Sequence, residues 1–340
     1  MIKIIVKSAL LWGMMVMNAA VRAEMFVVTT DGNPAVSMPP HFDSASLYPG
    51  MPLHPAMTAQ VDNSNVFSVI CRETGDIQPI RDSKQLRSAC QKVRDLDAYR
   101  AGGLSLYPVV ISPRVGKVLQ LRDIEWAYSG KGEYRMTLED ITAKKMVHTG
   151  TVSQQDSVRP YRLTTIRLPE PVRSSLVSDH EYLISIENIE SGQSTKEDAL
   201  FSGRFRIKDT LTKVQRQKLE ALREKNGDYF AAVYLSGLGY LHDSNQILNS
   251  ADSSRRPAAA AYLGIINARD AGVPLDYQMR LWMNGLSVAM QEDDKSTAAL
   301  ICLQVKKSRS DLAGYWQKYI AKVASAEKLK AFCDLTASIQ

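Results

Sequence analysis

Several features that mark common protein classes are missing from this 340-residue chain. Beyond the N-terminus no apolar run reaches about 18 residues, the length that a helix needs to cross a bilayer, which excludes a protein with many membrane spans. Glycine (19 residues) and proline (14) are too few for a fibrous or low-complexity chain. Hydrophobic residues make up 45% and charged residues 23%, the usual proportions of a folded protein, so wholesale disorder is excluded as well.

The motifs of common catalytic and cofactor sites are also absent. The chain has no G-x-S-x-G, H-E-x-x-H, Walker or G-x-G-x-x-G motif and no C-x-x-C pair. The acidic clusters at 139–140 and 292–294 lie where elements are expected to end, positions that favour charge for capping and solvation. The five histidines are too scattered for a zinc site: His41, His54, His148, His180 and His242. We therefore expect a protein without catalytic residues, metal or cofactor, although catalytic groups can lie far apart in sequence.

Net charge gives little support to a nucleic-acid partner. The 42 Lys and Arg residues exceed the 36 Asp and Glu residues, for a net charge of +6 at pH 7. Three of the positive charges, on Lys3, Lys7 and Arg22, precede the first acidic residue, Glu24. Nucleic-acid-binding proteins concentrate basic residues in a dense patch or stripe. The excess that remains after Glu24 is small, so we expect no nucleic-acid partner.

Residues 1–23 have the three parts of a secretory signal peptide. Met1–Lys7 includes two lysines, Ser8–Ala20 is an apolar core, and small residues precede a cleavage site after Ala23. The alternative is an uncleaved anchor, but a core of about 13 residues is too short to span ~30 Å of hydrocarbon. We expect cleavage between Ala23 and Glu24, export to the periplasm, and no stable membrane span in the mature protein.

All four cysteines follow the expected cleavage site. An even number of cysteines in an exported protein favours disulfide bonds, and four cysteines allow three connectivities. The local pairing, Cys71 with Cys90 and Cys302 with Cys333, keeps each bond within one expected domain. The alternative for Cys302 and Cys333 is two unrelated buried thiols.

The first part of the mature chain divides into two segments. Residues 24–41 contain turn residues and little periodicity, which predicts a flexible lead-in. Residues 42–100 include Val66–Cys71, a short apolar run rich in strand-forming residues. We therefore predict a small β unit over 42–100 that the Cys71–Cys90 bond staples together.

Two larger regions follow, over 101–208 and 209–340. In the first, apolar and polar residues alternate with a period of two along Tyr134–Leu138 and Tyr182–Ile186, which predicts an antiparallel sandwich with Trp126 in its core. In the second, the apolar period becomes helical and predicts eight short helices stacked as hairpins. The predicted fold class is multidomain α+β: two β regions followed by an all-α region.

Short motifs within 101–208 resemble an Ig-like domain found in exported bacterial proteins. The motifs in question are Ile111-Ser112-Pro113-Arg114, Ile124-Glu125-Trp126, Tyr134–Leu138 and His180-Glu181-Tyr182. In such proteins a FecR-like β segment often precedes this domain. The residues similar to that segment are Leu47-Tyr48-Pro49-Gly50, Leu53 and Val69-Ile70-Cys71.

Tetratricopeptide-like helices often follow the Ig-like domain in those proteins. The residues similar to these helices are Tyr262-Leu263-Gly264, Gly272, Trp282, Leu286, Ala289 and Asp293-Asp294. The resemblance implies an extracytoplasmic scaffold or binding role rather than a shared reaction. Tyr and Trp are favoured at interfaces, although they also fill gaps between helices. The candidate partner-binding residues of the helical region are Tyr262, Asn267, Tyr277 and Trp282.

Three functions remain as hypotheses. The first is a periplasmic, non-catalytic scaffold that docks an envelope protein or peptide. The second is an envelope enzyme acting on cell-wall or surface polysaccharide, which would need two facing carboxylates about 5–10 Å apart. The third is a glycan-binding sandwich, which would need exposed aromatic rings at Trp126, Tyr134 and Tyr182.

Overall fold

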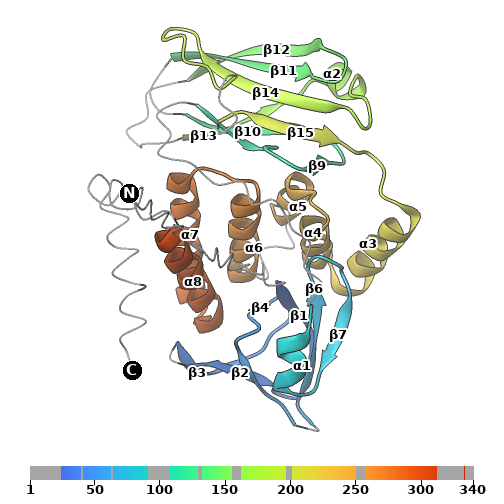
Figure 1. Cartoon of the computed structure of the whole chain (residues 1–340), viewed down its shortest axis with the longest axis vertical. Helices are drawn as coiled ribbons and strands as arrows, with labels where there is room; N and C mark the ends of the chain where they lie inside the picture. Colours follow the sequence, from blue (N-terminus) through green and yellow to red (C-terminus); the bar gives the residue numbers. More distant parts are fainter. Residues whose placement is uncertain are drawn as a thin grey trace, which may run out of the picture.

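The computed structural model arranges the chain in three layers (Figure 1). Two β sheets form the layer at the top of that view, helices form the middle layer, and the N-terminal strands form the bottom layer. The expected signal peptide over 1–23 and the helices expected after 311 lie outside the described residues. The described residues are 24–39, 41–62, 64–90, 108–128, 132–154, 162–196, 201–249, 257–311 and 333.

The bottom layer consists of two small antiparallel sheets and one short helix. One sheet has the order β4-β1-β6-β7 and the other β3-β2-β5. The helix α1 (Ser83–Ser88) begins at Asp82, whose side chain accepts a hydrogen bond from the Gln85 amide. The strands are β1 (Met25–Asp31), β2 (Ala35–Met38), β3 (Phe42–Ser46), β4 (Pro52–Leu53), β5 (Thr58–Gln60), β6 (Val66–Cys71) and β7 (Ile77–Ile80).

The prediction of a flexible lead-in over 24–41 is wrong. Strand β1 lies between β4 and β6, and Met25, Phe26 and Val27 are fully buried. Met25 pairs with Cys71 in the antiparallel register. A central strand that is buried on both faces has a continuous apolar run instead of alternation, so the period-two criterion does not detect it.

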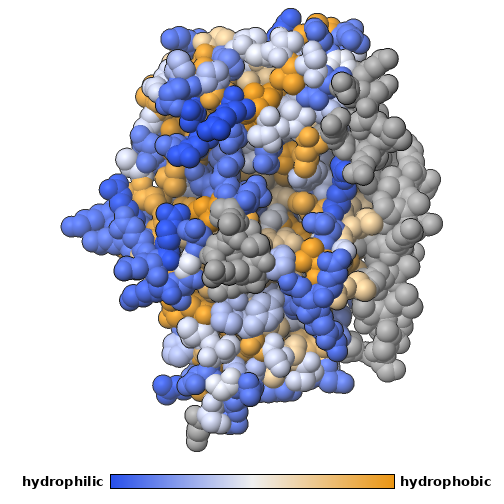
Figure 2. All heavy atoms as spheres, turned by 180° about the vertical axis from the view of Figure 1, so that it is seen from behind, coloured by the Kyte–Doolittle hydropathy of each residue, from blue (hydrophilic) through white to orange (hydrophobic). Residues whose placement is uncertain are grey.

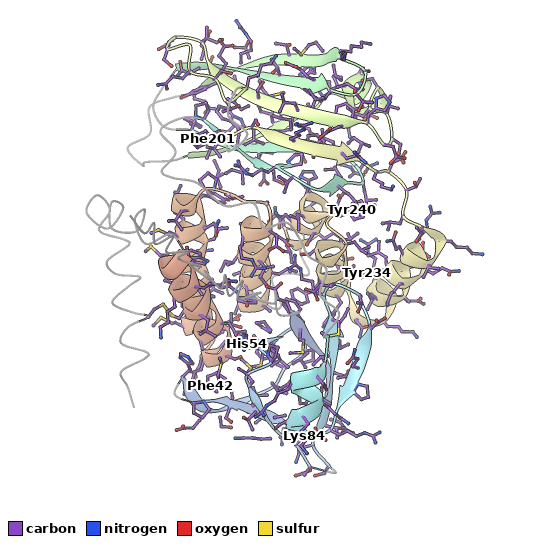
Figure 3. The ribbon with its side chains drawn as sticks, in the orientation of Figure 1. Phe42, His54, Lys84, Phe201, Tyr234 and Tyr240 are labelled. Carbon is purple, nitrogen blue, oxygen red and sulfur yellow. A yellow bond between two sulfur atoms is a disulfide. The ribbon has the colours of Figure 1, made fainter. Side chains whose placement is uncertain are left out.

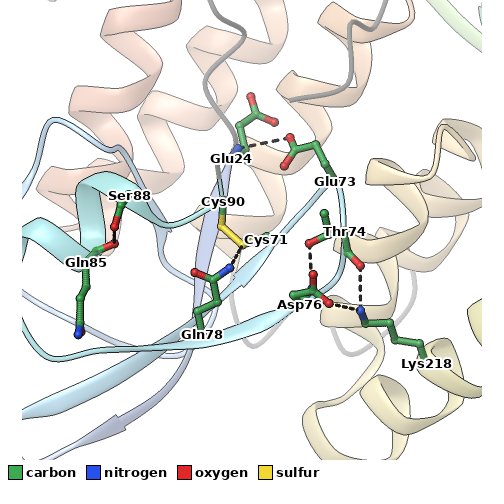
Figure 4. The surroundings of a disulfide bond; sticks show 10 residues. All are labelled: Glu24, Cys71, Glu73, Thr74, Asp76, Gln78, Gln85, Ser88, Cys90 and Lys218. Carbon is green, nitrogen blue, oxygen red and sulfur yellow. Dashed lines mark hydrogen bonds and ion pairs between the residues drawn. A yellow bond between two sulfur atoms is a disulfide. The ribbon is translucent and has the colours of Figure 1, made fainter. Parts of the chain in front are cut away.

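Both predicted disulfide pairings are confirmed. The Cα atoms of Cys71 and Cys90 are 5.2 Å apart, and the bond ties the end of β6 to the residues after α1 (Figure 4). The Cα atoms of Cys302 and Cys333 are 5.4 Å apart. Both distances lie within the range that a disulfide spans.

The top layer consists of two sheets around one core. The three-stranded sheet has the order β13-β10-β8 and the five-stranded sheet β12-β11-β14-β15-β9. Trp126, Tyr134 and Tyr182 are buried in this core, and the rings of Trp126 and Tyr134 lie 5.0 Å apart. The elements are β8 (Val109–Ser112), β9 (Lys117–Val118), β10 (Asp123–Tyr128), β11 (Gly132–Asp140), β12 (Lys145–Gln154), β13 (Arg162–Arg167), α2 (Glu170–Ser174), β14 (Glu181–Asn188) and β15 (Gly203–Ile207).

This layer departs from a purely antiparallel arrangement at one edge. Strand β9 pairs with β15 in parallel, with Arg206 opposite Lys117. A parallel pair needs a long connection, and the connection from β9 to β15 here contains most of the layer. The period-two pattern indicates strands but does not determine which strands pair.

The middle layer contains the described helices of the region 209–311. The first begins after Thr212, because the Thr212 side chain and Gln215 form a capping box there. It ends at Gly227. The helices are α3 (Lys213–Asn226), α4 (Asp228–Gly237), α5 (Leu241–Leu248), α6 (Pro257–Asp270), α7 (Leu275–Gln291) and α8 (Lys295–Asp311).

The helices share one hydrophobic core with the bottom layer, although some 120 residues of sequence separate the two. The ring of Tyr234, labelled in Figure 3, comes so close to the β6–β7 turn that a Cβ on Gly75 would lie 2.4 Å from it. Gly75 also has a φ of +66°. Tyr48 donates a hydrogen bond to Asp294 at the start of α8. The bottom layer and the helices therefore form a single packed body.

The top layer rests on the opposite side of the helices. A smaller apolar cluster joins Val109 and Phe201 of the top layer to Leu241 on α5 and Ala268 on α6. Figure 3 labels Phe201 and Tyr240 close to this boundary. The boundary between the two layers is the place where a hollow remains.

The described surface has a mixed character. On the face shown in Figure 2, hydrophobic and hydrophilic residues are interspersed. No helix in the part of the chain that the structure describes is long and apolar enough to cross a membrane.

Candidate functional site

A hollow of about 260 Å³ lies between the three-stranded sheet and the helices α5, α6 and α7. Strands β8 and β10 form one side of it, and the helices form the other. Asn249 and Asn284 line it and are exposed, so they mark its rim. Ligand sites often occur where two domains meet, because neither domain closes the gap between them completely.

His242 and Ser112 form a hydrogen-bonded pair in the wall of this hollow. The Ser112 Oγ lies 2.8 Å from the His242 Nδ1, and both side chains are buried. The His242 Nε2 is buried and has no hydrogen-bond partner among the described residues. Burial lowers the pKa of His242 to about 4, so the imidazole is neutral at pH 7. When Ser112 donates to Nδ1, the Nε2 atom carries the proton and can donate to a ligand.

Asn267 connects the hollow to the core of the helical layer. Its Oδ1 accepts a hydrogen bond from Ser236 on α4, and its Nδ2 donates to Ser244 and Asn245 on α5, over 3.0 and 2.7 Å. The Asn267 amide is fully buried and uses both its oxygen and its nitrogen within the protein. It therefore holds three helices in register and orients Asn245, which also lines the hollow.

Glu125 on β10 supplies the one carboxylate among the described residues that line the hollow. Desolvation, and secondly the charge of Asp123, raises its pKa. Burial and then the Glu125 charge raise the pKa of Tyr277 to about 12, while Arg280 opposes the shift. The hollow thus presents a carboxylate and a phenol in addition to His242.

Small residues of α6 form the apolar wall: Ala260, Ala261, Gly264 and Ala268. A Cβ atom built on Gly264 would meet no atom within 4 Å. The wall consequently has room at Gly264, and a larger side chain there would enter the hollow.

The structure separates the four candidate partner-binding residues into two groups. Asn267 and Tyr277 line the hollow. Tyr262 and Trp282 are 5% and 2% exposed and belong to the core that the helices share with the bottom layer. Their burial leaves neither ring available to a partner in this structure.

Sequence reasoning did not identify Ser112, Glu125 or His242 as site residues. Ser112 and Glu125 lie in the motifs that carry the Ig-like resemblance, and His242 is one of the five scattered histidines. His242 lies in the first turn of α5, but nothing local in the sequence shows that Ser112 of β8 bonds to it.

The comparisons with known proteins do not assign this chain to a family. No family model matches the chain, and no curated protein matches it.

Within the described part of the chain, no group of three or more His, Cys, Asp and Glu side chains could hold a metal ion.

The neighbours His242 and Asp243 should give opposite pH dependences of stability. Burial lowers the pKa of His242 from 6.5 to about 4, so the unfolded chain takes up the proton first and acidification over this range destabilises the fold. Burial raises the pKa of Asp243 from 3.8 to about 6, although the Leu119 and Gln120 amides oppose the shift. Here the folded form takes up the proton first, so acidification below about pH 6 stabilises the fold.

We expect the two contributions, each about 3 kcal/mol, to cancel largely between pH 4 and 6. His242→Gln should gain stability relative to the parent as the pH falls from 6 to 4, whereas Asp243→Asn should lose it. Urea unfolding at each pH measures the free energy of unfolding of the variant minus that of the parent. The contributions of all other titratable groups cancel in this difference. Equal differences at pH 4 and pH 6 for both variants would contradict the assignment.

Replacing either of two helical glycines with alanine should change the stability of the fold in opposite directions. Gly264→Ala should stabilise by about 0.5–1 kcal/mol, because a helical Gly carries an entropic penalty and the new methyl group meets no atom. Gly285→Ala should destabilise by about 1 kcal/mol or more, because its Cβ would lie 2.9 Å from Ile265 Cδ1 and 3.0 Å from Ile301 Cδ1. Thermal unfolding of both variants tests the pair. A loss of stability in Gly264→Ala would show that the space there is not open, and a gain in Gly285→Ala would show that Ile265 and Ile301 can move aside.

Proposed function

We propose that this protein is a non-catalytic interaction protein of the periplasm and that its hollow receives one side chain of a protein or peptide partner. In this proposal the top layer is an Ig-like sandwich, the middle layer is tetratricopeptide-like, and the bottom layer is FecR-like. The two disulfides are compatible with an exported protein, since such bonds persist in oxidising compartments.

The observation that carries the proposal is the hollow, which His242 lines together with Glu125 and the small residues of α6. The buried Nε2 of His242 has no hydrogen-bond partner among the described residues. A buried polar atom without a hydrogen bond is unfavourable, and an occupant that accepts from it removes that penalty. The apolar wall of α6 can contact an apolar group of the occupant, and the Glu125 carboxylate can contact a polar one. The occupant that fits is a side chain with an apolar stem and a polar tip.

The Ser112–His242 pair supports binding better than hydrolysis. In a serine hydrolase the histidine accepts the serine proton, and a carboxylate holds its other ring nitrogen. Here the other nitrogen, Nε2, has no partner among the described residues. A pKa of about 4 also makes His242 a weak general base at neutral pH.

The two alternative functions gain less support. Trp126, Tyr134 and Tyr182 are each at most 1% exposed, so these rings provide no platform for a sugar. A glycan-cleaving site needs a second carboxylate facing Glu125, and the described residues that line the hollow supply none.

Photocrosslinking in cells that export the protein tests the proposal. A benzophenone amino acid at Asn284, on the rim of the hollow, should crosslink a partner, whereas the same group at Val214, 72% exposed on α3, should not. Gly264→Leu should fill the hollow and abolish the crosslink, and Gly264→Ala is the matched control that should retain it. Absence of a crosslink at Asn284, or equal crosslinking in both Gly264 variants, would refute the proposal.

A further inference from the structure

A cluster of buried charges joins the start of the described chain to α6. The Arg72 guanidinium lies 2.5 Å from Glu24 Oε2 and 2.5 Å from Asp270 Oδ2. The Arg269 guanidinium lies 2.9 Å from Glu24 Oε1 and 2.8 Å from Asp270 Oδ1. The side chains of Arg72, Glu24 and Asp270 are at most 12% exposed. Such a cluster is stable only when its charges are compensated.

The side-chain charges in this cluster do not balance. Glu73, which is 8% exposed, adds a third carboxylate to Glu24 and Asp270. Arg72 and Arg269 supply two positive charges, so one negative charge is left over. The Glu73 Oε2 is buried and has no hydrogen-bond partner among the described residues. The backbone nitrogen of Glu24 lies 3.4 Å from Glu73 Oε1, as the dashed line in Figure 4 shows.

We propose that cleavage of the leader after Ala23 creates the missing positive charge, and that the new α-ammonium of Glu24 pairs with the Glu73 carboxylate. Hydrolysis by a leader peptidase adds water across the Ala23–Glu24 peptide bond. Ala23 keeps the new carboxylate, and the amine of Glu24 takes up a proton. The cluster then has three carboxylates, two guanidinium groups and one ammonium. Removal of the leader thereby stabilises the fold of the mature protein.

The uncleaved chain lacks this compensation. Its Glu24 nitrogen is a neutral amide, which donates a hydrogen bond but carries no charge. Desolvation, and secondarily the charge of Glu24, raises the pKa of Glu73, while Arg72 opposes the shift. A carboxylate in such a site is stabilised strongly by a positive charge at hydrogen-bond distance.

Four forms of the mature chain, residues 24–340, test the proposal: Glu24 free or N-acetylated, each with Glu73 or with Glu73→Gln. The free form should unfold about 2–6 °C above the acetylated form at pH 7. This difference should shrink in the Glu73→Gln background. N-terminal sequencing of the exported protein should find Glu24 as the first residue.

The pH dependence is a second readout that needs no substitution in the cluster. The unfolded α-amino group has a pKa of about 7.7–8.0, and pairing raises it in the folded form. The advantage of the free form is therefore complete below about pH 7.7 and is lost as the pH rises through the raised pKa. The titratable groups that face the ammonium or its neighbours are Glu24, Glu73, Arg72, Arg269, Asp270 and Tyr262.

The outcomes separate clearly. A stability difference that disappears at high pH supports the pairing even if Glu73→Gln does not fold. Equal unfolding temperatures for the free and acetylated forms at pH 7, a difference that is independent of pH, or a mature chain that begins at another residue would each overturn the proposal.

Discussion

Replacing Gly237 with alanine is expected to lower the free energy of unfolding by more than about 3 kcal/mol, a cost at the upper end for overpacking a core. Gly237 ends α4 where the helix meets the end of β6. A Cβ there would lie 1.7 Å from the carbonyl oxygen of Arg72 and 2.3 Å from its carbonyl carbon. Both atoms belong to the backbone, so no side chain can move aside, and the helix or the strand must shift.

Denaturant unfolding of Gly237→Ala beside Gly264→Ala measures this effect. Both substitutions add one methyl group to a helix, but only the first meets backbone atoms. The expected result is a large loss of stability for the first and a small gain for the second. A Gly237→Ala protein with parental stability would show that α4 does not pack against Arg72 as described.

Replacing Arg72 with methionine is expected to lower the free energy of unfolding by about 3–5 kcal/mol, the usual cost of removing one partner from a buried ion pair. Arg72 is 1% exposed and bonds to Glu24, Asp270 and, through its Nε, to the Ser236 hydroxyl 2.8 Å away. Methionine retains much of the apolar stem but leaves these carboxylates with Arg269 alone.

Arg135→Met is the matched control for this prediction. Arg135 also bonds a carboxylate, that of Glu187 at 3.1 Å, but its side chain is 45% exposed. An exposed ion pair contributes about 0–1 kcal/mol, so this variant should unfold close to the parent. Similar losses for the two arginines would show that the Arg72 cluster is solvated rather than buried.

Local signals in the sequence account for most of the elements that were predicted. Strands β6, β11 and β14 follow from a short apolar run or from alternation, and α3 ends at Gly227 because glycine is favoured at helix ends. The pairing of Cys302 with Cys333 follows from their position within one expected domain of an exported protein. In each case the residues that carry the signal lie within one strand, one helix or one expected domain.

Longer-range features were not predictable in this way. Turn residues predict a flexible segment over 24–41, whereas the burial of strand β1 depends on its neighbours β4 and β6. Tyr262 and Trp282 are candidates for a partner surface by sequence, yet both are buried in the core that the helices share with the bottom layer. Period and composition do not show which face of a helix another layer covers.

The sequence by itself indicated many of the local elements, the order of two β regions followed by helices, and the local pairing as one of three possible disulfide connectivities. Only the tertiary structure decided that the helices lie between the two β layers. The same packing forms the hollow from Ser112, Glu125, His242 and Asn267, and it brings Glu24 and Arg72 against Asp270. Periodicity and capping depend on neighbours along the chain, whereas hydrogen bonds and charge compensation in a core depend on residues that only packing brings together.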